Sequence, residues 1–102
     1  MAQYRGGKKS SELHRLTGQK NVIATRLVEA RLSHRPPWSQ ERLCNELQSQ
    51  GRLTIDQATI GKIETQTRGV YDYEIVALAL TLSVSSDWLL GLSSSSDSSS
   101  VG

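Results

Sequence analysis

The chain of 102 residues contains no phenylalanine, one cysteine (Cys44) and no long apolar run. A single cysteine permits neither an intrachain disulfide nor a cysteine metal cluster, which favours a reducing compartment, the cytoplasm. The apolar stretch at residues 75–82 is too short to span a bilayer, and residues 1–15 lack the apolar segment of a secretion signal. The hydrophobic content of 36% predicts one modest core, with part of the chain left unstructured.

Basic residues are missing from the last third of the chain, because none follows Arg68. Residues 1–68 carry all 12 Lys and Arg against six acids, a balance of +6, whereas residues 69–102 carry four acids and no base, a balance of −4. This asymmetry predicts that one half of the protein faces a polyanion while the other turns away from it. The alternative is that both halves are simply solvated.

Both ends of the chain lack the periodicity of packed elements. Residues 1–20 are basic and predict a flexible arm, and residues 93–102 are nearly all serine and predict a disordered tail. The cations of the arm either follow DNA, along its backbone or in its minor groove, or only keep the chain soluble; they are Lys8, Lys9, Arg15 and Lys20. The folded domain is therefore expected at residues 21–92.

Apolar residues at helical spacing predict five helices and no sheet, at residues 21–33, 39–49, 56–68, 72–82 and 86–91. Asn21, Ser39 and Asp56 stand at the starts of the first three, as capping residues do. Gly69 is expected to end the third helix. The fourth is apolar nearly all round, which predicts a central buried helix.

The third of these segments, "DQATIGKIETQTR", has a glycine in its middle, where Gly costs about 1 kcal/mol relative to Ala. Ile60 and Ile63 point inward, and the opposite side carries Gln57, Ala58, Gly61, Lys62 and Thr65. Small side chains allow close approach to a DNA major groove, and the polar ones reach base edges. The alternative is that Gly61 only makes room for another helix.

The preceding helix begins with Ser39 and Gln40, where free backbone amides and a hydroxyl suit a phosphate. Two consecutive helices, one with a phosphate-ready start and one with a small polar outer face, predict a helix-turn-helix.

From Ile23 to Leu92 the chain resembles the Cro-like phage repressor domain, the xenobiotic-response-element type of helix-turn-helix. The resemblance rests on "LVEAR", "SQERLCNEL", "TIGKIE", "DYEIVALALTLSV" and "SSDWLLGL", in this order. It implies a compact, all-α, five-helix bundle of the lambda-repressor-like type. It also implies a transcriptional regulator, expected to be a repressor, that binds a palindromic double-stranded operator as a homodimer.

The same resemblance implies a role for each matching residue. Gln40 would hold a phosphate beside Ser39, Thr59 would lie near the DNA backbone, and Thr65 and Arg68 would contact flanking phosphates. The residues facing bases would be Gln57, Ala58 and Lys62. Arg31 and Glu64 would form a buried ion pair, and Glu64 directly after buried Ile63 independently calls for such a partner.

The chain departs from the family in the connection between its second and third helices. Residues 48–55 separate Leu47 from Asp56, where the family has a tight turn, and Gln48 replaces the turn glycine. The dimer surface is expected in the last helix and the loop before it, at Trp88, Leu89 and Leu92.

No nucleophile–base constellation or phosphate-binding loop is present, so we expect no enzyme and no cofactor. His14 and His34 stand alone, which predicts no metal site, and Cys44 is expected to be inert core. Two other functions remain open. The first is an antitoxin or restriction–modification controller that represses its own operon. The second is a protein-interaction module that has lost DNA binding.

Overall fold

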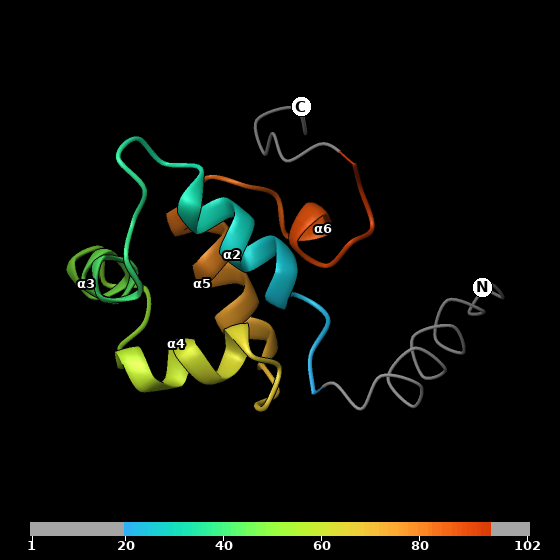
Figure 1. The fold of residues 1–102 in the computed structure, drawn as a ribbon, viewed down its shortest axis with the longest axis horizontal. Coiled ribbons are helices and arrows are strands. Elements are labelled where there is room, and N and C mark those ends of the chain that lie inside the picture. Colours follow the sequence, from blue (N-terminus) through green and yellow to red (C-terminus); the bar gives the residue numbers. More distant parts are fainter. Residues whose placement is uncertain (1–19, 95–102) are drawn as a thin grey trace, which may run out of the picture.

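The computed structural model describes residues 20–94, and these residues form five α-helices and no β-strand. The helices are α2 (Ala24–Leu32), α3 (Gln40–Ser49), α4 (Gln57–Glu64), α5 (Asp72–Leu82) and α6 (Ser86–Leu89). In Figure 1, α5 passes behind α2, α3 is seen end-on, and α4 runs across the view below it. The expected all-α bundle is therefore confirmed. Almost all of the predicted arm and tail lies outside the described residues.

Side-chain caps start the helices where the sequence predicts them. Ser39 Oγ accepts a hydrogen bond from Arg42 N at 2.9 Å, and Asp56 Oδ1 accepts one from Thr59 N at 2.8 Å. The first helix begins three residues later than expected, at Ala24. Asn21 Oδ1 still accepts from the backbone of Ile23 and Ala24, at 3.0 and 3.1 Å, and so satisfies amides that have no partner within the helix.

The prediction that Gly69 ends the third helix is wrong. Helix α4 ends at Glu64, and Gln66 takes the left-handed conformation with φ of 66°. Gln66 N then donates to Ile63 O at 3.1 Å and Thr67 N donates to Lys62 O at 2.9 Å, which is the pattern of a Schellman closure. Glutamine is an uncommon residue for this conformation, so no residue type at this position marks the end of the helix.

The core lies between all five helices. Its fully buried large side chains are Ile23, Leu27, Leu43, Leu47, Ile60, Ile63, Leu78 and Leu89. The inward stripe predicted for the second helix is confirmed, since Cys44 is also buried. Trp38 packs against this core from just before α3.

Helix α5 is not buried all round, contrary to the sequence prediction. It packs against α3 and α6, and Ala77, Leu78 and Leu82 lie on that buried side. Val76 and Leu80 are more than half exposed on the other side. With only five short helices, no element within residues 20–94 is left to cover this side.

Candidate nucleic-acid interface

Helix α4 separates an apolar inner side from a small polar outer side, as the sequence predicts. Ile60 and Ile63 are fully buried, whereas Gln57, Ala58 and Lys62 are exposed. Within the described part of the chain, Lys62 has no hydrogen-bond or ion-pair partner through its ammonium group. These three side chains therefore point to solvent from one helix.

Gly61 is not required by the packing of the bundle. A Cβ atom built at this position would meet only the side-chain amide of Gln40, at 3.8 and 3.9 Å, which is ordinary contact. The alternative that the glycine makes room for another helix is therefore not supported by the geometry. Packing within the bundle therefore gives no reason for the cost of this glycine to helix stability.

The expected ion pair between Arg31 and Glu64 is present and is nearly buried. Arg31 Nε and Nη2 donate to the two carboxylate oxygens of Glu64 at 2.7 and 2.9 Å, and the two side chains are 11% and 6% exposed. Arg31 Nη1 also donates to Trp38 O at 2.7 Å. One guanidinium thus joins α2 both to the end of α4 and to the residue before α3's cap.

Gln40 extends this pair to the outer surface. Its Nε2 donates to Glu64 Oε1 at 2.9 Å, and its Oε1 accepts from Gln57 Nε2 at 3.4 Å. The amide of the first residue of α3 therefore bridges the buried carboxylate and the first side chain of α4. The resemblance implies only a phosphate contact for Gln40, whereas in the structure its side chain also links Glu64 to Gln57.

Three hydroxyl groups predicted to lie near a DNA backbone stabilise helix ends. Ser39 Oγ accepts its capping bond and keeps its own hydrogen for another partner. Thr59 Oγ1 donates to Asp56 Oδ1 at 2.7 Å, and Thr65 Oγ1 donates to Gly61 O at 3.0 Å. Since a phosphate needs donors, Ser39 is the only one of the three that can bind one without giving up a bond within the described residues.

Arg68 is held by α5 and is not part of the outer face of α4. Its Nη1 and Nη2 donate to the two oxygens of Glu74 at 2.9 and 3.0 Å. The hydrogen bonds from Arg68, opposed by burial, hold the pKa of Glu74 below its ordinary value. The phosphate contact predicted for Arg68 would compete with this ion pair.

Asn21 has a second role that the sequence did not reveal. Its buried Nδ2 donates to Ile63 O at 3.0 Å and to Arg68 O at 2.8 Å. The residue therefore ties the start of α2 to the end of α4 and to the turn beyond it. A polar residue before a helix indicates a cap, but only the fold brings distant carbonyl groups to the same side chain.

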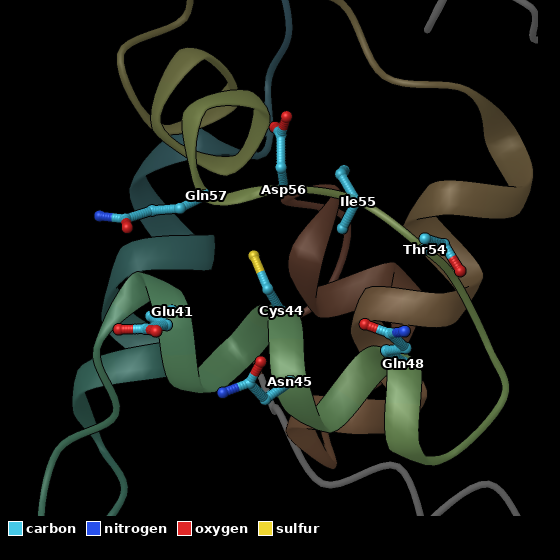
Figure 2. Close-up of a pocket in the computed structure, with 8 residues that line it drawn as sticks. All are labelled: Glu41, Cys44, Asn45, Gln48, Thr54, Ile55, Asp56 and Gln57. Carbon is cyan, nitrogen blue, oxygen red and sulfur yellow. The ribbon is translucent and has the colours of Figure 1, made fainter.

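A groove of about 540 Å³ lies between α3 and the segment leading into α4. Figure 2 shows Cys44 at its floor, with the sulfur directed into the gap beneath Asp56. Burial first, and then the carboxylates of Asp56 and Glu41, raise the pKa of the Cys44 thiol. The thiol is therefore a poor nucleophile, and a groove lined by two carboxylates and no cation does not suit a phosphate.

Comparisons with protein-family models, curated proteins and solved structures gave no match to this chain. No helix within residues 20–94 is long and apolar enough to cross a membrane. The same residues bring together no group of three or more His, Cys, Asp or Glu that would hold a metal ion.

Proposed function

We propose that this chain is a sequence-specific, double-stranded DNA-binding transcriptional regulator that acts in the cytoplasm as a repressor. The observation that carries the proposal is the outer face of α4, with exposed Gln57, Ala58 and Lys62 around a glycine that the packing does not require. A helix of this kind fits a major groove, because the small positions admit the backbone and the polar ones reach base edges.

The arrangement next to α4 supports the same function. Helix α3 begins with Ser39 and Gln40, and the Gln40 amide lies against Gln57 at the start of α4. In a complex, the free amides at the start of α3 would bind a phosphate while Gln57 reads a base edge. An amide such as Gln57 pairs best with adenine, and Ala58 is small enough to contact a thymine methyl group.

A single helix of this length covers few base pairs, so specific binding calls for two copies on a palindromic operator. An autoregulating antitoxin or a restriction–modification controller would use the same face and the same contacts. These variants of the proposal differ in the genes controlled and not in the DNA-binding surface.

One observation favours a protein-interaction module instead. The groove beside the start of α4 carries Glu41 and Asp56, and carboxylates there repel phosphates. If this groove were the functional surface, Lys62 would be incidental to it.

Selection from a random duplex pool at physiological salt tests the proposal with the full chain. Enrichment of a palindrome is expected. Lys62→Glu should abolish the enrichment, whereas Arg52→Glu makes the same change of net charge at a side chain that bonds Thr81 of α5 and should leave it intact. Binding without enrichment, or equal effects of the two variants, would contradict specific readout by α4. Absence of binding would favour the interaction module.

A further inference from the structure

Exposed apolar side chains gather on one side of α5. Tyr73, Val76 and Leu80 follow one another at spacings of three and four residues, which places them on one helix face. The ring of Tyr71 stacks on Tyr73, with centroids 5.5 Å apart and planes 5° from parallel. We call these four residues the α5 stripe.

The α5 stripe is a continuous surface, unlike the single exposed apolar residues that any protein has. Each of its four side chains is between 52% and 60% exposed. The other exposed large apolar residues in the described part of the chain are separate from it in sequence, at Val22, Leu32 and Leu92. Continuous apolar patches on small domains mark contact surfaces.

We propose that the α5 stripe is a homodimer interface, in which it packs against the stripe of a second copy in antiparallel orientation. Of the expected dimer surface, Trp88 and Leu89 are buried in the core and Leu92 alone is exposed, so two of the three side chains of that surface are not available. The use of this dimer on an operator rests on the proposed function. Self-association through the stripe does not.

The scarcity of charged groups around the α5 stripe favours a partner surface that is itself uncharged. No Lys or Arg follows Arg68, and the Arg68 guanidinium, which lies 5.8 Å from the centroid of the Tyr71 ring, is paired with Glu74, so the stripe offers no unpaired cation to a nucleic acid or an acidic protein. Of the two acids of α5, Glu74 is buried and paired with Arg68, which leaves Asp72 as the exposed charge of the helix. A second copy supplies the uncharged apolar surface that the stripe matches.

The carboxylate of Asp72 favours the antiparallel orientation of the two helices. A parallel pair would set Asp72 beside the partner's Asp72, whereas an antiparallel pair centred on Val76 sets it opposite the partner's Leu80. At 1.5 Å per residue, the two carboxylates are then about 12 Å apart along the helix axes. Tyr73 then lies within one residue of the level of the partner's Leu80, and such a self-complementary arrangement is what a two-fold axis requires.

The available area indicates a weak dimer. An aromatic side chain offers roughly 150–250 Å² when fully covered, and more than half of each tyrosine remains open. The stripe therefore contributes roughly 400 Å² per copy, or about 800 Å² for both copies before any polar rim. This lies below the roughly 1,000 Å² of an ordinary specific interface, so we expect a weak dimer that forms only at high protein concentration.

Sedimentation equilibrium of the full chain without DNA, from about 1 μM to 500 μM, tests the interface. The wild-type chain should dimerise within this range. Val76→Glu should raise the dissociation constant by roughly tenfold to a hundredfold, because it places two charges against each other in an apolar contact. Leu32→Glu is the matched control on α2, and it should associate as the wild type does. Thermal melts verify that both variants fold.

A wild-type chain that stays monomeric throughout, or a Val76→Glu variant that associates normally, would overturn the proposal. Orientation is tested by Asp72→Cys and Val76→Cys, each in a Cys44→Ala background. Mild oxidation should link two copies through position 76 but not through position 72, since only a parallel pair brings the two copies of residue 72 together. A linked Asp72→Cys variant, or a Val76→Cys variant that does not link, would overturn the antiparallel pairing. If the chain dimerises through the stripe but selects no DNA, this inference stands and the proposed function is refuted. If the chain stays monomeric but selects an operator, the proposed function stands and this inference is refuted.

Discussion

Neutralising Glu64 is the sharpest test of how the two helices of the candidate interface are held. Glu64 accepts three hydrogen bonds on a side chain that is 6% exposed, two from Arg31 and one from Gln40. Glu64→Gln keeps the size of the side chain but leaves the Arg31 guanidinium as a nearly buried charge without a counter-charge. Removing one member of a buried pair costs about 3–5 kcal/mol.

This cost is large for a domain of this size. Small domains have about 5–15 kcal/mol of total stability, and 1 kcal/mol shifts Tm by about 4–8 °C for 60–100 residues. We therefore expect Glu64→Gln or Arg31→Ala to lower Tm by about 15 °C or more. DNA binding should fall with it, since the pair no longer positions the end of α4 against α2.

A matched control separates this pair from surface electrostatics. Glu46 pairs with Arg42 at 2.8 Å within α3, where the side chain of Arg42 is 52% exposed and that of Glu46 is 26% exposed, so Glu46→Gln makes the same chemical change at a pair that solvent reaches. It should leave Tm nearly unchanged because solvent screens exposed pairs.

The coupling is measured by a double-mutant cycle in urea. Arg31→Met combined with Glu64→Met removes both charges, and it should be more stable than either single variant. If Glu64→Gln shifts Tm no more than Glu46→Gln, or if the two Met substitutions are additive, the buried pair does not hold the helices as argued.

Four further changes test other parts of the structure. Asn21→Ala removes four hydrogen bonds and should cost about 2–4 kcal/mol in urea unfolding, because it leaves the carbonyl group of residue 68 and the amides of residues 23 and 24 without that partner, while the carbonyl group of residue 63 keeps Gln66 N. Gln66→Gly should stabilise the domain by about 1 kcal/mol, since glycine adopts the positive φ freely; an unchanged urea midpoint would contradict this. Gly61→Ala should raise helix stability by up to about 1 kcal/mol and yet weaken DNA binding, and equal or tighter binding would remove Gly61 from the interface. Folding lowers the pKa of Glu74, so its ionised carboxylate adds to the free energy of unfolding. This stabilisation is complete above the unfolded-state pKa of about 4.3 and is lost as pH falls through the lower folded-state pKa. Glu74→Gln should therefore make the free energy of unfolding fall less steeply in acid.

The sequence predicted the helices well because their signals are local. Caps at Ser39 and Asp56 and the inward spacing of Ile60 and Ile63 depend only on neighbouring residues, and the structure has them as expected. The end of α4 was missed because a glutamine adopts the left-handed conformation that glycine usually supplies.

Tertiary contacts account for the remaining differences. Whether Val76 is buried depends on how many helices pack around α5, and the sequence of α5 alone does not predict that number. Arg68 has the same side chain whether it meets a phosphate or Glu74, and only the fold brings Glu74 within 3 Å. The Arg31–Glu64 pair was predictable because a carboxylate beside a buried isoleucine needs a partner.

The network around Glu64 also explains how the bundle tolerates a long connection before α4. A tight turn would fix the relative position of α3 and α4 through the backbone, but residues 50–56 separate them here. Arg31 instead joins Glu64 to Trp38 O, and Gln40 joins Glu64 to Gln57, so side chains position the start of α3 and both ends of α4. Loop length adds little entropy cost, so a long connection is tolerated where side chains supply this positioning.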